Sequence, residues 1–318
     1  MAQSERLIVI LVAMAANVAL ALLKFGAFLL TGSPSMLAET YHSISDTGNQ
    51  ILLLVGMYYS RKEANKLHPF GYGKASFFYA FLVSVLLFGI AGWESLTHGI
   101  DALRHGASLA GGELTVRGRT IPAVYLAYLV LIATILFDGF SYWRARVALD
   151  EETDIRGWRS FREAFQKTSD TPVLAVLTEN AVAAVGATIA LVAIFISQVT
   201  GNPVFDAIGA VLIGLLLMTF AIVLGIENKR LLIGEGLSER HQQPLEEIAE
   251  SHEDVVDVSE LRTVYFGPDS VIVTADVAFD PDLDTETIDE LITEIEAALK
   301  AQEPLIEKVY IEPEISEE

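Results

Sequence analysis

The sequence predicts an α-helical membrane protein with six transmembrane helices, followed by a C-terminal cytoplasmic α+β domain of the ferredoxin-like type. Of its 318 residues, 52% are hydrophobic and 20% are charged, which is too apolar for a soluble chain of this length. Charge is also divided unevenly, because residues 229–318 carry 25 Asp and Glu against 6 Lys and Arg, whereas residues 1–228 carry 17 against 15. We therefore expect a transmembrane domain over 1–228 and an acidic soluble domain over 229–318.

Six apolar stretches in the first region are long enough to cross a bilayer, which takes about 20 helical residues. The first stretch is interpreted as a span and not as a signal peptide, because it lacks a basic segment before it and a small-residue cleavage site after it. The expected spans lie near residues 7–30, 36–60, 77–99, 121–143, 172–197 and 203–226.

The distribution of Lys and Arg predicts the orientation, because positively charged connections stay on the cytoplasmic side of a membrane. Both termini and the acidic domain are therefore expected in the cytoplasm, with the spans in the cell membrane. The cytoplasmic set is Arg61, Lys62, Lys66, Lys74, Arg144, Arg146, Arg156, Arg159, Arg162, Lys167, Lys229 and Arg230, against Arg104, Arg117 and Arg119 on the other side.

The acidic region predicts alternating helices and strands, read from its amphipathic and β-branched runs. The order is compatible with a small ferredoxin-like sheet that has helices on one face. The expected elements are a helix from Ser238 to about Ser251, strands over 255–266 and 270–279, a helix over 285–300 and a strand over 305–311.

Composition excludes several classes of function. The net charge of −21 argues against a nucleic-acid partner, which requires a cationic face. The chain has no cysteine, so disulfides and thiolate metal sites are excluded, and His, carboxylates, amides and carbonyls remain as metal ligands. No phosphate-binding Gly-x-x-x-x-Gly-Lys loop is present, which argues against a transport step driven by ATP.

Ionisable residues at membrane depth are costly, and the second span holds the densest set. Glu39, His42, Asp46 and Asn49 follow at steps of three, four and three, which places them on one helical face. A His and an Asp one turn apart can bind one cation through a ring nitrogen and a carboxylate oxygen. The alternative is a buried His–Asp pair that only ties helices together.

The fifth span contributes Glu179 and Asn180. At ~1.5 Å per residue, both fall near the same membrane level as Asp46, close to the middle of the bilayer. A site at that level can be opened to either side, as a transporter requires. We therefore predict a metal site built from His42, Asp46, Glu179 and Asn180.

Other polar residues are interpreted more weakly. Lys24 is expected to have a structural role, with a second interpretation as counter-charge to the carboxylates when no cation is bound. Glu94 and Asp206 fall near the outer end of their spans and Asp138 near the inner end, as vestibule residues or as acids reaching the membrane surface. His98, His105, His241 and His252 are read as solvent-facing, the first two in an outer loop.

Several motifs follow one another over nearly the whole chain. They are Lys24…Thr31-Gly32-Ser33…Leu37-Ala38-Glu39…His42-Ser43…Asp46, Lys62-Glu63-Ala64…His68-Pro69-Phe70-Gly71-Tyr72-Gly73-Lys74, Asp206-Ala207-Ile208-Gly209, and Glu227-Asn228-Lys229…Leu232-Ile233-Gly234-Glu235. With these motifs in this order, the chain resembles the cation diffusion facilitator family of divalent-metal/proton antiporters, in the branch that contains the ninth human zinc transporter.

The resemblance implies that His42 and Asp46 are transport-site ligands, that the fifth span supplies the others, and that the protein is a homodimer with paired tails. Most zinc-transporting members carry His-x-x-x-Asp in that span, where this chain has Val176 and Asn180. Glu179 is the substitute carboxylate, although it points about 100° away from its neighbour Asn180. The tail contains no His cluster that resembles a regulatory metal site.

The leading hypothesis is a secondary active exporter of divalent transition metals, in exchange for protons. Zinc or iron is the expected cargo, with manganese and cobalt as further substrates, and no cofactor is bound permanently. The alternatives are a passive cation channel, a metal sensor without proton coupling, and an intramembrane hydrolase. The strongly acidic tail suggests a source with a salt-rich cytoplasm, such as a halophilic prokaryote.

Overall fold

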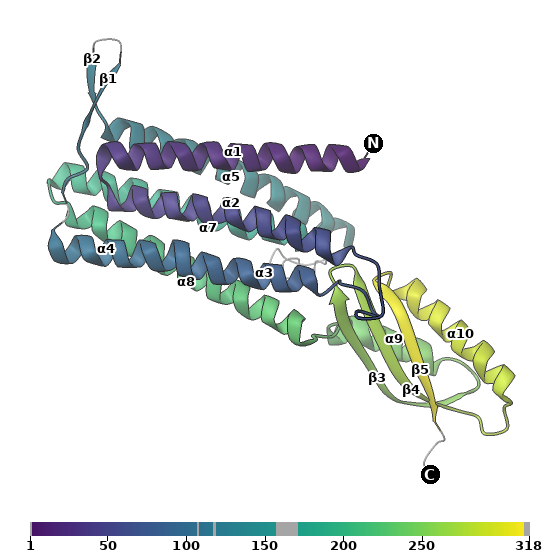
Figure 1. Cartoon of the computed structure of the whole chain (residues 1–318). Coiled ribbons are helices and arrows are strands. Elements are labelled where there is room, and N and C mark those ends of the chain that lie inside the picture. The colour runs from purple at the N-terminus through teal and green to yellow at the C-terminus, as the bar shows by residue number, and fades with distance from the viewer. Residues whose placement is uncertain (1, 107, 117–118, 157–170, 315–318) are drawn as a thin grey trace. The chain divides into compact units, whose positions relative to one another are not determined.

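The computed structural model describes residues 2–106, 108–116, 119–156 and 171–314 (Figure 1). Of the basic residues that set the predicted orientation, Arg117, Arg159, Arg162 and Lys167 lie outside the described residues. The chain separates into two compact units, which are considered one at a time. The first contains residues 1–51 and 83–224, and the second contains 52–82 and 225–318.

The first unit is formed by long helices. Among the described residues, four helical segments are long and apolar enough to cross a membrane, and a shorter apolar segment covers Asn17–Thr31. The four are Ala75–His105, Val124–Val147, Leu177–Thr200 and Val204–Ile233. The predicted helical membrane domain is thereby confirmed in its coarse form. The helices are α1 (Ala2–Thr31), α2 (Pro34–Ser60), α3 (Ala75–Leu86), α4 (Trp93–His105), α5 (Val124–Arg156), α7 (Thr171–Thr200) and α8 (Val204–Ile233).

The turn between α1 and α2 follows from its residues. Gly32 adopts a left-handed φ of 66° and ends α1, a conformation that costs glycine little. Ser33 then caps α2, because its Oγ accepts the backbone N–H of Met36 at 3.2 Å. Pro34 stands at the first helical position, where its missing N–H is not needed.

The third apolar stretch is interrupted by a π-helical segment, η1 (Leu87–Gly92), between α3 and α4. Small residues let α8 approach this region closely, as is common between helices in membranes. A Cβ added to Gly92 would stand 2.6 Å from the Met218 side chain, and one on Gly214 would stand 2.6 Å from the backbone of Leu96.

Two features of the first unit were not predicted. The connection after α4 contains a short antiparallel hairpin, β1 (Glu113–Val116) with β2 (Arg119–Pro122). The connection is also anchored to the helices, because the Gln198 side chain donates to the Ala110 carbonyl at 2.6 Å. In addition, α5 continues to Arg156, beyond the apolar stretch that predicted it. Helix α5 packs against α1 and α7 (Figure 1).

The C-terminal part of the second unit has the predicted order of helix, strand, strand, helix and strand. Strand β4 lies at the centre, antiparallel to β3 and parallel to β5, and α10 provides the crossover between the parallel strands. Helix α9 packs on β3, and α10 packs on α9 and β5 (Figure 1). The elements are α9 (Glu239–Glu250), β3 (Val255–Gly267), β4 (Ser270–Phe279), α10 (Thr285–Gln302) and β5 (Ile306–Glu314).

The tail encloses its own hydrophobic core, which includes fully buried Leu245, Val273, Ile295 and Leu299. Every second residue of β4 points into this core, whereas the described acidic residues of the tail are mostly exposed. Burial raises the pKa of Tyr265, and the carboxylates of Glu303 and Glu235 raise it further.

The second unit also includes the connection between α2 and α3. Its Phe70 ring lies 5.7 Å from the Phe266 ring and 6.3 Å from the Tyr310 ring, and the Lys74 ammonium lies 5.4 Å from the centre of the Phe266 ring. His68 packs against Tyr72, with 4.2 Å between ring centres. Phe70 of this connection therefore contacts the end of β3 and the middle of β5.

Candidate functional site

The polar face of α2 points into the helical unit, as its spacing predicted. Glu39, His42 and Asn49 are buried, and the side chain of Asp46 is 16% exposed. His42 and Asp46 are four residues apart, and His42 Nε2 lies 3.2 Å from Asp46 Oδ2. One imidazole nitrogen and one carboxylate oxygen thus face each other inside the apolar unit.

Helix α7 approaches Glu39 and His42 at a glycine. A Cβ added to Gly186 would stand 2.7 Å from Glu39 Oε1 and 3.8 Å from His42 Nδ1. Only glycine allows this close approach without displacing a side chain. A single glycine in the middle of an apolar span is the signal that could have predicted it.

Glu179, two turns earlier on α7, is partly buried, and its carboxylate interacts electrostatically with Asp46. Asn180 follows it and is also partly buried. The Asp138 carboxyl on α5 interacts electrostatically with Glu179. Within the described parts of the chain, no three His, Asp or Glu side chains converge closely enough to hold a metal ion. The structure therefore joins His42 to Asp46 and leaves Glu179 within electrostatic range.

A second polar contact lies beside this pair, between α1 and α2. The Lys24 ammonium donates to Glu39 Oε2 at 2.7 Å, and the two side chains are 2% and 0% exposed. Lys24 is thus the counter-charge of a carboxylate on the same helical face as His42. The sequence suggested both roles for Lys24, as interhelical tie and as counter-charge, and this contact combines them.

Asp206 does not have either of the roles predicted for it, because it is fully buried and binds the start of α2. Its Oδ1 accepts the Ser33 hydroxyl at 3.0 Å and the Ser35 backbone N–H at 3.1 Å. The Ser35 hydroxyl donates to the Asp206 carbonyl at 2.7 Å. A carboxylate at a helix N-terminus is stabilised by the orphan N–H groups and the helix dipole, so the residue fixes where α2 begins.

The expected loop position of His98 and His105 is wrong, because both lie in α4. The third apolar stretch continues as a helix to His105, so these residues belong to its last turns. His98 stacks on Tyr41 with 5.7 Å between ring centres, and His98 Nε2 lies 3.2 Å from the Tyr41 hydroxyl and 3.7 Å from Glu94 Oε2. Glu94 therefore has a neighbour on its own helix.

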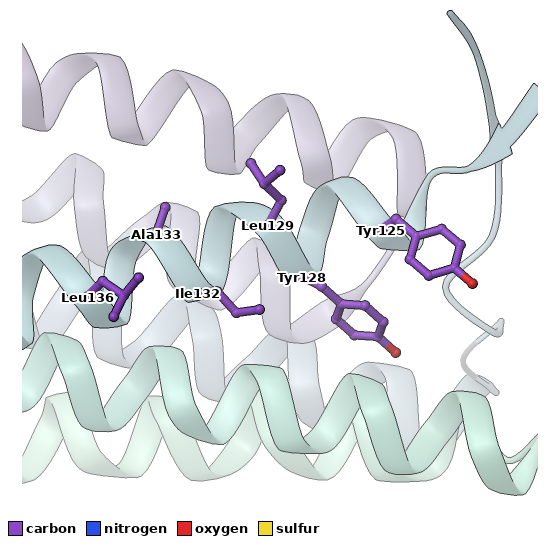
Figure 2. A pocket seen from close by; sticks show the side chains of 6 residues that line it. All are labelled: Tyr125, Tyr128, Leu129, Ile132, Ala133 and Leu136. Atoms are coloured by element: carbon purple, nitrogen blue, oxygen red, sulfur yellow. The ribbon is translucent and has the colours of Figure 1, made fainter. Parts of the chain in front are cut away.

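A surface hollow lies away from this polar cluster. It is a shallow apolar depression on α5, lined by Tyr125, Tyr128, Leu129, Ile132, Ala133 and Leu136 (Figure 2). Its lining carries no carboxylate or imidazole, so it has none of the chemistry of a cation site.

In the described part of the tail, His241 contacts a carboxylate, with its Nδ1 3.1 Å from Glu303 Oε2. Two ligands are too few for a structural divalent site. Over the described residues of the tail, no third His, Asp or Glu joins them to form a metal-binding group.

Two family models match the chain in succession. The cation efflux transmembrane domain matches residues 10–233, and the cytoplasmic domain of cation efflux proteins matches residues 237–315. The chain belongs to the cation diffusion facilitator family. It therefore contains the multi-pass transmembrane domain of cation efflux proteins, followed by their cytoplasmic domain.

Several curated relatives are similar over most of this chain. The proton-coupled zinc antiporter SLC30A9 of Homo sapiens is 27% identical over 301 residues, 93% of this chain and 51% of that protein. Metal tolerance protein C4 of Arabidopsis thaliana is 27% identical over 81% of this chain and 53% of that protein. The cation-efflux pump FieF of Escherichia coli O139:H28 is 29% identical over 78% of this chain and 73% of that protein. The chain thus spans about half the length of the first two.

Among solved structures, the cadmium form of a MamM C-terminal domain is similar to the tail. It has 26% sequence identity and a TM-score of 0.24, and the match covers 26% of this chain and 100% of that domain.

Proposed function

We propose that this cation diffusion facilitator exports a divalent transition metal in exchange for protons, with the His42–Asp46 pair of α2 as its transport centre. The observation that carries the proposal is the 3.2 Å contact between His42 Nε2 and Asp46 Oδ2, inside the helical unit and beside α7. Glu179 completes the centre from α7, and Asn180 offers a neutral amide oxygen.

The charges of these groups suit a divalent ion. Asp46 and Glu179 interact electrostatically, and one ion of charge +2 would neutralise both carboxylates. The Glu39 carboxylate already has Lys24 as its partner. His42 supplies a ligand that needs no neutralisation. This balance supports Glu179 as a member of the centre.

Proton coupling follows from the same ligands. A carboxylate and an imidazole bind a metal only through deprotonated atoms, so the metal-bound and protonated forms of His42 and Asp46 exclude each other. A centre that releases metal to one side can therefore carry protons on its return. The human relative is named as a proton-coupled zinc antiporter, which supports an exchange of metal for protons by the present chain.

The decisive experiment measures metal uptake into inside-out vesicles with a pH-sensitive dye inside. Asp46→Ala should lower uptake by at least about 100-fold, because it removes a ligand from the centre. Asp101→Ala, at an exposed acid of α4, is the matched control and should transport normally. Uptake at the wild-type rate in Asp46→Ala would show that the centre is elsewhere. Metal entry without a change of internal pH would favour a passive channel.

The ligand set favours a broad range of metals. One imidazole with several oxygens is a harder site than one with two imidazoles, and it accepts manganese, iron(II) and cobalt alongside zinc. We expect zinc or iron as the principal cargo, carried as substrate and not as a resident cofactor.

Substitutions in the first turns of α7 test which metal the protein prefers. Val176→His, alone or with Asn180→Asp, should shift competition transport assays toward zinc, because an imidazole and a carboxylate would replace an apolar and an amide group. The side chain of Val176 lies outside the described residues. A wild-type protein that strictly selects zinc over tenfold excess manganese and iron(II) would contradict the proposed ligand set.

We also propose a homodimer with six spans per subunit, both termini in the cytoplasm of a prokaryotic cell, and a domain boundary after residue 228. The match of the tail to the cytoplasmic domain of cation efflux proteins supports the dimer. Crosslinking of the purified protein in lipid nanodiscs, and protease access to each terminus in oriented vesicles, would test these assignments.

A further inference from the structure

Two buried polar atoms beside the transport centre are left without a partner among the described residues. They are Glu39 Oε1 and His42 Nδ1. Both lie within 4 Å of one point, the position that a Cβ on Gly186 would occupy. Because a buried polar atom without a partner is costly, such atoms mark places where a water molecule or an ion binds.

The other oxygen of Glu39 is held by a buried cation. Lys24 Nζ lies 2.7 Å from Glu39 Oε2, and its charge also acts on His42, Asp46 and Asp138. A buried ion pair contributes little stability beyond that of apolar side chains of the same volume. Stabilisation of the contact between α1 and α2 therefore does not by itself explain why each helix carries a buried charge there.

The position of the ion pair relates it to the route of an exported ion. Glu39 precedes Asp46 by seven residues on α2, which is about 10 Å along the helix at ~1.5 Å per residue. With the tail in the cytoplasm, this displacement is toward the outside. Cargo leaving the His42–Asp46 pair in that direction passes Glu39.

His42 connects the two positions. Its Nε2 faces Asp46, and its Nδ1 faces the point beside Gly186. A neutral imidazole has one nitrogen with a free lone pair, so His42 can ligate a cation on one side at a time. A carboxylate oxygen with an imidazole nitrogen is a donor set suited to zinc and related divalent ions.

We propose that Glu39 and His42 Nδ1 form an outer cation position against Gly186, and that the Lys24 ammonium occupies its carboxylate when cargo is absent. The inference rests on the proposed transport function, because His42 belongs to both positions. Lys24 acts as a tethered competitor of the cargo. Its charge keeps the outer position weak, so that an ion arriving there is released.

Cobalt(II) titration can separate the outer position from the inner one, which is the His42–Asp46 pair. Cobalt(II) is titrated into the protein in nanodiscs, and the visible absorption of the bound ion is followed. Asp46→Asn disables the inner pair and should weaken binding by about 100-fold. Adding Lys24→Met should restore binding by at least about tenfold, because the Glu39 carboxylate then has no competing cation. Further addition of Glu39→Gln, or of Gly186→Ala, should remove the restored binding.

Each failure has its own meaning. If Asp46→Asn binds cobalt(II) like the wild type, the proposed transport centre is wrong. If it loses binding but Lys24→Met restores none, only the outer position is wrong. The neutral double variant Lys24→Met with Glu39→Gln controls for folding, since it leaves no unpaired buried charge.

Transport by the single variants gives an independent readout. Lys24→Met should lower both KM and kcat, because the ion binds more tightly at the outer position and leaves more slowly. Lys24→Arg keeps the charge and should retain wild-type KM. A purely structural pair would lower the amount of folded protein without lowering KM, and that result would overturn the proposal.

Discussion

The helical unit and the tail place polar and apolar side chains in opposite ways. In the helical unit, large apolar residues such as Leu215 and Phe195 are exposed, while Lys24, Glu39 and Asp206 are buried. In the tail, Leu245 and Ile295 are buried, and the acids of residues 229–314 are mostly exposed. The comparison shows that these buried charges of the helical unit each have a specific polar partner, whereas most charged side chains of the tail are exposed.

The largest effect expected from this contrast comes from truncating apolar residues. Ile295→Ala should destabilise the tail by about 2–5 kcal/mol, because it removes a fully buried side chain and leaves a cavity. Chemical denaturation of residues 229–318 measures the change. Leu215→Ala, on α8, should change the stability of the detergent-solubilised chain by less than about 0.5 kcal/mol, because its side chain faces the apolar surroundings.

A large loss of stability in Leu215→Ala would contradict the comparison for the helical unit. It would show that this exposed face of α8 is covered by protein in the assembled molecule and not by lipid. Wild-type stability in Ile295→Ala would contradict the comparison for the tail.

A second, smaller effect concerns salt. The tail carries a net charge of −19, and salt screens repulsion between its acids over about 10 Å at 0.1 M. We infer a salt-rich cytoplasm, so the melting temperature of residues 229–318 should rise steadily toward molar potassium chloride. The variant Glu290→Gln with Glu294→Gln removes two exposed like charges one turn apart on α10 and should reduce this slope. A melting temperature that is indifferent to salt would refute the inference.

The smallest effect expected concerns the cap of α10. The pKa of Asp284 is lowered, first by the backbone N–H of Thr287 and also by its hydroxyl, which donate to Oδ1 at 2.9 and 2.8 Å. The ionised carboxylate therefore stabilises the tail at pH values above its ordinary pKa of 3.8, and this contribution is lost as the pH falls through the lower folded value.

Asp284→Ala should accordingly lower the melting temperature of the tail at pH 7, with the difference from wild type shrinking at pH 3. Asp282→Ala, an exposed acid two residues earlier, should show little difference at either pH. A difference that persists undiminished at pH 3 would mean that the ionised cap is not its source.

Much of the tail was predictable because its signals are local. Alternating apolar residues in 255–266 and 270–279 determine which face of each strand is buried, so both strands were found within one residue of their bounds. The short β1–β2 hairpin was missed, since its four-residue strands have too few alternating positions to give a signal.

For the site, the sequence determined the face of α2 and the His42–Asp46 spacing, because a helical period of 3.6 residues leaves no other arrangement. Tertiary structure alone paired Lys24 with Glu39, used Asp206 to cap α2 and brought Gly186 against the polar face. Each of these contacts joins residues on different helices. Helix packing depends on side-chain fit between surfaces, which periodicity along one helix does not encode.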